Sequence, residues 1–97
     1  AGPEIRLSAG EAMMGDAVHT DAPTLDFTVV TRGAAGMTLE LHGAAGLLMQ
    51  QALDDAQTEH SIPVSVRDTL YVRAQLVTGR DGERQVHALT NPIYLSH

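Results

Sequence analysis

The sequence predicts an all-β fold, an immunoglobulin-like β-sandwich of about seven short antiparallel strands. Turn-forming residues recur about every ten positions, the spacing typical of small all-β sandwiches. Between the turns, apolar and polar residues alternate with the two-residue period of a strand that buries one face. With 97 residues, the chain has room for one domain, 1–97, and a single modest core.

The first third of the chain predicts two strands and a long connection. Residues 4–9 alternate apolar and polar side chains, and Gly10 ends this strand. Residues 11–23 predict an extended connection with a turn at Gly15-Asp16. The alternating segment TLDFTVV, residues 24–30, is the second strand.

The next strand lies between two copies of the sequence GAAG, at 33–36 and 43–46. Two turns of small residues around one strand explain this repeat, because a solenoid would need longer units and at least about three of them. Residues 37–42 therefore form a strand with an apolar inner face. Its outer face is expected to hold Glu40 and His42 in solvent.

Residues 46–57 fit either a helix or a strand. Leucine, methionine, glutamine and alanine are good helix formers and favour the first. Against a helix, Gly46 opens the segment without a cap, and the strands on both sides need an antiparallel neighbour. We expect a short strand near 46–51 followed by a loop.

Two more strands and a hairpin follow. Pro63 has no N–H for a sheet and places the segment 61–66 at a sheet edge. Residues 69–78 give the strongest strand signal of the chain. Asp81-Gly82 then predicts a hairpin turn, after which residues 83–90 return beside that strand.

The last strand is interrupted by Asn91-Pro92, since proline donates no hydrogen bond and keeps the preceding residue out of the helical region. We expect the strand to step sideways here, and either to leave one sheet for the other or to run out along an edge. The Asn91 side chain is expected to bond to the backbone groups that the step frees.

The alternation also predicts which side chains fill the core and which form the polar face of the strongest strand. The polar face carries Tyr71, Arg73 and Gln75. The predicted core consists of Leu25, Phe27, Val29, Leu39, Leu41, Leu70, Val72, Ala74 and Leu76.

Composition argues against several functions. The net charge is −6 and all six basic residues are arginine, so the chain lacks the basic patch that nucleic-acid binding requires. No apolar run approaches the roughly 20 residues of a membrane span. The absence of cysteine excludes disulfides and thiolate chemistry but does not identify the compartment, cytoplasmic or exported. The arginine-rich, lysine-free composition indicates a bacterial source with a GC-rich genome.

No catalytic, cofactor-binding or metal-binding residue is predicted in the chain. Five histidines are present, but none has the spacing of a metal-ligand pair, and we expect them at the surface. The adjacent acids Asp54-Asp55 lack the ligand spacing of a calcium loop. The serines have no elbow or triad context.

The final segment, TLYVRAQLVTGRDGERQVHALTNPIYLSH, resembles the C-terminal end of PHP-type metal-dependent phosphoesterases, in particular the CehA/McbA-like metallohydrolases. The matching residues are Tyr71-Val72-Arg73, Ala88-Leu89 and Thr90 to Tyr94. The stretch GEAMMGDAVHTDAPTLDFTVV is similar to the start of the same region. The resemblance thus covers nearly the whole chain.

This resemblance implies a non-catalytic accessory β-sandwich domain that follows a PHP barrel and packs against it. The metal ligands of that family belong to the barrel, which would bind divalent Mn, Zn or Fe, and none of them is present here. The opening Ala1-Gly2-Pro3 fits a C-terminal fragment of a longer protein.

Contacts with the barrel are expected from Tyr71, Arg73, Asn91 and Tyr94, because tyrosine and arginine are enriched at interface hot spots. The simpler alternative for Arg73 is an ion pair with Glu83 or Asp26. The alternative function is an independent immunoglobulin-like module that binds a ligand or a protein, because a fold does not determine a function.

Overall fold

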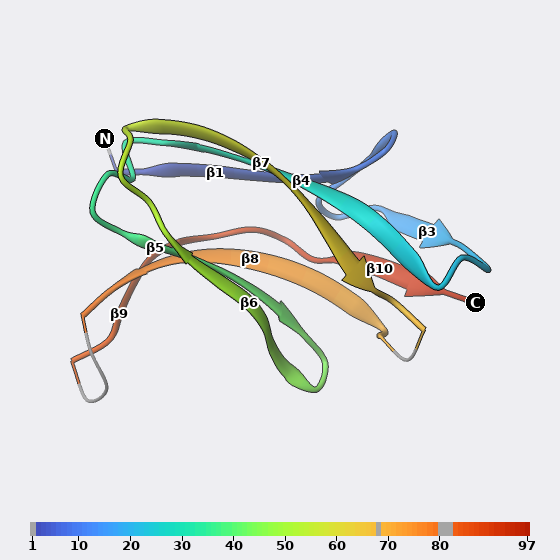
Figure 1. Ribbon diagram of the computed structural model, residues 1–97. Helices are drawn as coiled ribbons and strands as arrows, with labels where there is room; N and C mark the ends of the chain where they lie inside the picture. The colour runs from blue at the N-terminus through green and yellow to red at the C-terminus, as the bar shows by residue number, and fades with distance from the viewer. Residues whose placement is uncertain (1, 68, 80–82) are drawn as a thin grey trace.

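The computed structural model describes residues 2–67, 69–79 and 83–97. In these residues the chain forms two β-sheets packed face to face and no helix (Figure 1). No segment of the described part is therefore a helix able to span a membrane. The prediction of an all-β sandwich is confirmed.

The smaller sheet has four strands in the order β2-β1-β4-β7, all antiparallel. β7 is an edge strand, as Pro63 predicts. Its strands are β1 (Glu4–Ala9), β2 (Ala12–Met13), β4 (Thr24–Arg32) and β7 (Gln57–Ser65).

The larger sheet has six strands in the order β3-β10-β8-β5-β6, with β9 also paired to β8. The β3–β10 pair is parallel, which the all-antiparallel prediction missed. Its strands are β3 (Ala17–His19), β5 (Thr38–Gly43), β6 (Gly46–Ala52), β8 (Tyr71–Thr78), β9 (Gln85–Leu89) and β10 (Ile93–Ser96).

The described chain thus contains ten strand segments instead of about seven. The long connection 11–23 supplies two of the additional strands, β2 and β3, and the break before Ile93 divides the last strand into β9 and β10. The expectation of a strand near 46–51 is correct, since β6 spans Gly46–Ala52. The Asp81-Gly82 turn lies outside the described residues, although β8 and β9 pair antiparallel on either side of it.

The core lies between the sheets and contains most of the predicted residues. Leu25 is only partly buried and packs against it. Leu70, in contrast, is 65% exposed, because β8 begins at Tyr71 and Leu70 precedes the strand. The confirmed core residues are Phe27, Val29, Leu39, Leu41, Val72, Ala74 and Leu76.

The break at Asn91-Pro92 does not transfer the chain to the other sheet, contrary to one of the two expectations. β9 and β10 both pair with β8, so the interrupted strand stays in the same sheet. At the break, Thr90 N–H donates to the Ala74 carbonyl at 2.9 Å, and Ala74 N–H donates to Thr90 Oγ1 at 3.0 Å. Thr90 thus takes the role expected of Asn91, whose exposed side chain makes no hydrogen bond within the described residues.

Candidate functional site

The side of the six-stranded sheet that faces away from the core, called here the outer face, carries a cluster of polar side chains. On β5, Leu39 and Leu41 point into the core. Because side chains alternate along a strand, Glu40 and His42 point outward. On β8, the same alternation turns Tyr71, Arg73 and Gln75 outward. The strand register then sets Glu40 opposite Gln75 and His42 opposite Arg73.

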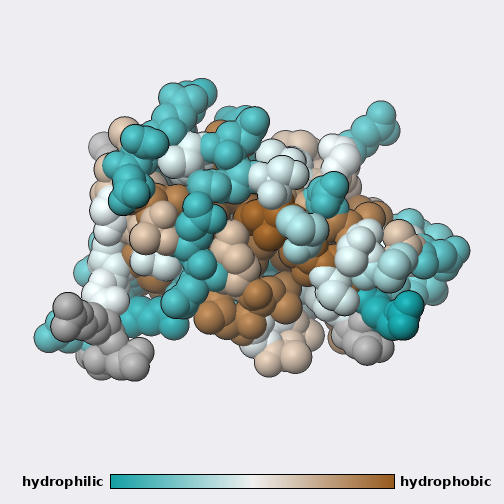
Figure 2. Space-filling model, viewed as in Figure 1, coloured by the Kyte–Doolittle hydropathy of each residue, from teal (hydrophilic) through white to brown (hydrophobic). Residues whose placement is uncertain are grey.

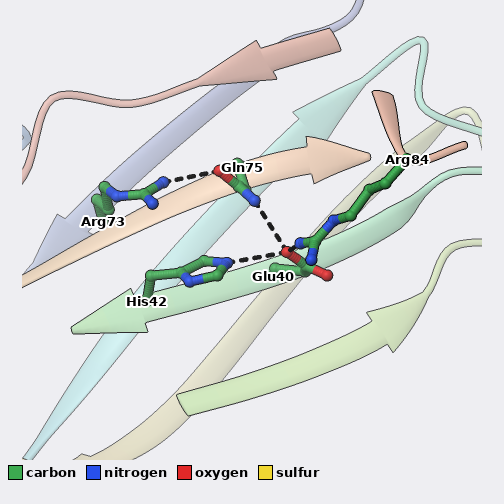
Figure 3. A network of polar contacts seen from close by, with 5 residues as sticks. All are labelled: Glu40, His42, Arg73, Gln75 and Arg84. Carbon is green, nitrogen blue, oxygen red and sulfur yellow. Dashed lines mark hydrogen bonds and ion pairs between the residues drawn. The ribbon is translucent and has the colours of Figure 1, made fainter. Parts of the chain in front are cut away.

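Glu40 is the centre of this cluster (Figure 3). Its Oε1 accepts hydrogen bonds from His42 Nε2 at 2.9 Å and from Gln75 Nε2 at 2.9 Å. The same oxygen forms an ion pair with the Arg84 guanidinium. Gln75 extends the cluster, because its Oε1 accepts from Arg73 Nη1 at 2.7 Å. The network joins β5 and β8 to the segment that leads into β9.

Arg84 follows the connection between β8 and β9, whose described ends, Gly79 and Glu83, lie close together. Gly79 begins this connection with a φ of 88°, a conformation that residues with a side chain rarely adopt. A Cβ at this position would lie 2.5 Å from the Glu83 carbonyl oxygen. Glycine at 79 therefore allows the close return that brings Arg84 over the outer face.

Glu40 and Gln75 are buried although they face away from the core: they are 4% and 7% exposed. The expectation that Glu40 lies in solvent is wrong, while its outward direction is right. β5 runs between β8 and β6, and the Glu40 carboxylate lies among the side chains of Gln75, His42 and Arg84. A buried carboxylate requires such partners, because an unpaired one would cost several kcal/mol, on the order of the desolvation of an ion.

The pKa of His42 is lowered by burial and, to a lesser extent, by the nearby Arg73 guanidinium. The hydrogen bond from Nε2 to Glu40 Oε1 does not require His42 to be charged, because the neutral imidazole can donate it. His42 is therefore a neutral hydrogen-bond donor that fixes the carboxylate near neutral pH.

Large apolar side chains surround the polar cluster on the outer face. Tyr94, Leu89 and Leu47 are 51%, 62% and 50% exposed. The register places each beside an outward-facing residue of β8 or β5: Tyr94 beside Tyr71, Leu89 beside Gln75, and Leu47 beside His42. The face thus combines a fixed polar centre with exposed apolar groups, a composition found at protein interfaces.

Three of the four residues predicted to make interdomain contacts meet on this face. Tyr94 and Tyr71 are direct cross-strand partners, and Arg73 follows two positions along β8. Asn91 lies in the break between β9 and β10 and is exposed. Within the described residues, Arg73 forms neither of the alternative ion pairs with Glu83 or Asp26 and donates instead to Gln75.

The sequence analysis missed the central role of Glu40 and the contribution of Arg84. The signal for both was incomplete: alternation identified outward positions on each strand, but only the register shows that Glu40 stands opposite Gln75. Arg84 belongs to the segment 83–90 that was expected to return beside the strongest strand, but β9 begins only at Gln85, and the contact of Arg84 with Glu40 follows from the tertiary structure.

The five histidines lie on four different strands and at residue 97. No group of three or more potential ligands gathers among residues 2–67, 69–79 and 83–97. His19, His87 and His97 are exposed as expected, whereas His42 and His60 are partly buried, which the surface expectation did not include. His60 belongs to β7 and pairs with the inward-facing Val29, so its ring points towards the space between the sheets.

The four-stranded sheet has an outer face of a different kind. Glu4, Arg6, Val30 and Arg32 line a shallow hollow on β1 and β4. The three charged residues are exposed. This face offers separate charged groups in solvent, and it also carries Met13 of β2, which is 46% exposed and pairs with the outward Ser8.

Comparison of the chain with models of protein families, with curated proteins and with solved structures finds no match.

Proposed function

We propose that the chain is a non-catalytic accessory β-sandwich domain of a PHP-type metal-dependent phosphoesterase, and that it docks on the catalytic barrel through the outer face of the six-stranded sheet. One observation carries the docking part: the outer face presents Tyr94 and Leu89 in solvent around a buried, hydrogen-bonded polar centre. The resemblance of the segment from Thr90 to Tyr94 supports the family.

The strand order supports an immunoglobulin-like topology within this proposal. β1-β4-β7 corresponds to the A-B-E side of that fold, and β5-β8 followed by the interrupted β9–β10 strand corresponds to C-F-G. In this correspondence β6 is an additional strand beside C. The face proposed for docking is then the side of the C-F-G sheet that does not contact the core.

The Arg73 side chain is already held by a hydrogen bond before any partner binds, and this supports docking at this face. An arginine free in solvent loses side-chain entropy when it is held in an interface, on the order of 0.5–1.5 kcal/mol. Arg73 already donates to Gln75, which in turn donates to Glu40. Part of this ordering is therefore complete before a partner arrives, and the remaining guanidinium donors are available for a carboxylate or a carbonyl of the barrel.

The test compares the isolated chain with the longer protein that carries it. Tyr94→Ala removes a half-exposed ring, so we expect a change in the unfolding free energy of the isolated chain within about 0.5 kcal/mol. In the longer protein, the same change should weaken the association between the domains and lower its thermal midpoint. Arg73→Ala should act in the same direction, and Thr28→Ala, on the outward side of the other sheet, is the matched control.

Equal destabilisation of the chain and of the longer protein by Tyr94→Ala would contradict docking. The family is tested separately, by the sequence that precedes Ala1 in the gene: a PHP barrel with its His and Asp motifs supports it, and a series of sandwich domains after a signal peptide contradicts it.

A separate assay tests the proposal that the chain itself is not catalytic. The chain incubated with manganese, zinc or iron and a generic phosphomonoester or phosphodiester should hydrolyse no more substrate than the metal alone. Turnover that survives repurification and disappears after a single His→Ala change would contradict the assignment.

A further inference from the structure

The two sheets end in two edge strands on the same side of the sandwich, β6 and β7 (Figure 1). They are consecutive in the chain and connected by residues 53–56. An edge strand presents unpaired N–H and C=O groups, and proteins usually prevent another strand from pairing there with charges, prolines or bulges. The two edges differ in these protective features.

The residues whose backbone faces the free edge follow from the hydrogen bonds. Leu53 N–H donates to the Met37 carbonyl at 2.9 Å, so Leu53 faces β5, and by alternation Gln51 and Met49 do so as well. Gln50 and Ala52 therefore direct their N–H and C=O groups away from β5. In β7, Val66 N–H donates to the Pro23 carbonyl at 3.0 Å, so the alternate residues, which include Ser61 and Pro63, face its free edge.

β7 is protected and β6 is not. Pro63 lacks an N–H in the outward row of β7, and Glu59 in the same row carries a charge. β6 reads GLLMQQA, without charge or proline. Leu47 and Leu48 beside its turn are 50% and 40% exposed, and Figure 2 shows brown apolar atoms gathered over this end of β6. The bulge at this end, between Leu41 and His42 of β5, leaves the outward groups of Gln50 and Ala52 unaffected.

We propose that β6 pairs with β6 of a second copy of this chain, antiparallel and about a two-fold axis, so that the two six-stranded sheets become continuous. In such a two-fold contact, both copies contribute the same strand, so the assembly is complete as a dimer. The partner must be an extended segment, because the groups to be satisfied are the outward backbone N–H and C=O of Gln50 and Ala52.

Charge selects both the partner edge and the direction of pairing. Each copy carries a net charge of −6, so two copies repel except where a neutral segment meets another. β6 provides that segment. In the sequence, the nearest acids, Asp54 and Asp55, follow it at one end only, and Glu40 on the neighbouring β5 is paired with Arg84. Antiparallel pairing places the two Asp54-Asp55 pairs at opposite ends of the contact, whereas parallel pairing would set them side by side.

The contact is small, and we therefore expect a reversible dimer. A strand of seven residues buries less than the roughly 1,200 Å² typical of stable complexes. Salt should strengthen the association, because it screens the repulsion between two acidic chains. The contact does not depend on the proposed docking role.

The experiment is sedimentation velocity of the whole chain over a concentration series, at low and high salt. The wild type should shift from monomer to dimer as its concentration rises. Gln50→Pro deletes an outward donor without touching the β5–β6 hydrogen bonds and should weaken the dimer at least about tenfold. Ser61→Pro, at the equivalent outward position of β7, is the matched control and should leave the dimer unchanged.

Leu48→Lys is the second variant, since a charge at the edge should also prevent pairing. Thermal melts of each variant verify that it folds. A wild-type chain that stays monomeric at every concentration and salt overturns the proposal. So does a folded Gln50→Pro variant that dimerises like the wild type, or a Ser61→Pro variant that alone loses the dimer.

Discussion

The outer faces of the two sheets start from the same strand pattern and end in different states. On β5, the outward Glu40 is buried and bound by three donors. On β1, the outward Glu4 is exposed, opposite an exposed Arg32 on β4. Both glutamates occupy the polar positions of alternating strands, so alternation alone does not distinguish them.

The difference comes from the neighbours. β5 lies between β8 and β6 over its whole length. The chain segment before β9 contributes Arg84, which forms an ion pair with Glu40. β1 has β4 on one side, and on the other side β2 pairs only with Ser8 and Ala9. A polar side chain on a sheet surface thus becomes buried where it has long neighbours on both sides, and burial then demands hydrogen bonds.

The largest change in unfolding free energy is expected in the core, and the changes on both outer faces are compared with it. Leu39→Ala removes a fully buried side chain next to Glu40 and should lower the unfolding free energy by about 2–4 kcal/mol. Urea denaturation of the variant and the wild type measures it. A smaller loss than that of Glu40→Ala would mean that the outer-face network, and not the core, dominates β5.

Glu40→Ala should come next. The change leaves the buried Gln75 amide without its acceptor, at about 1–3 kcal/mol. Glu40→Gln keeps an acceptor oxygen and loses the ion pair with the part-exposed Arg84, so its cost should stay below about 1 kcal/mol. The same denaturation assay separates the two, and equal costs would show that charge rather than hydrogen bonding holds the network.

The pH dependence of stability should be smaller and attributable to His42. Because the folded state lowers the pKa of His42 below its ordinary 6.5, the unfolded chain binds the proton more readily. The stabilising contribution is therefore complete above the unfolded pKa and is lost as the pH falls towards the folded pKa.

His42→Gln tests this assignment, since glutamine still donates a hydrogen bond to Glu40 but does not titrate. Between about pH 7.5 and 5.5, the unfolding free energy of the wild type should fall further than that of the variant. Equal losses in both proteins would assign the pH dependence to other groups.

The smallest effect is expected on the four-stranded sheet. Glu4→Ala alters an exposed side chain and should change the unfolding free energy by less than about 0.5 kcal/mol. A cost close to that of Glu40→Ala would remove the distinction between the two faces.

Much of the fold was predictable because it depends on local pattern. Alternation gave the inward rows of β4, β5 and β8, and Pro63 gave the edge position of β7. The prediction was wrong for Leu70 because the alternating pattern of the sequence continues past the end of β8, where side chains no longer follow the strand. It was incomplete for the last strand, where Thr90 rather than Asn91 bonds to the backbone.

The candidate site was predictable only in part. Tyr71 and Arg73 were placed correctly on the polar face of β8, because both are outward residues of the strand with the clearest alternation. The position of Tyr94 opposite Tyr71 follows only from the strand register. Arg73 was given carboxylate partners, whereas it bonds to the neighbouring Gln75. The partner of a charged side chain cannot be chosen from sequence spacing when the neighbouring strand and its register are unknown.

The sequence by itself determined the β architecture, the inner faces of the main strands, the edge position of the segment that contains Pro63 and the lack of charge in residues 46–52. These properties follow from side-chain periodicity, proline chemistry and local charge, which act over a few residues. Only the tertiary structure decided that Glu40 is buried, that Arg84 pairs with it and that β10 stays beside β8. These outcomes depend on which distant strands become neighbours, and the free energy of burial and pairing arises only after they meet.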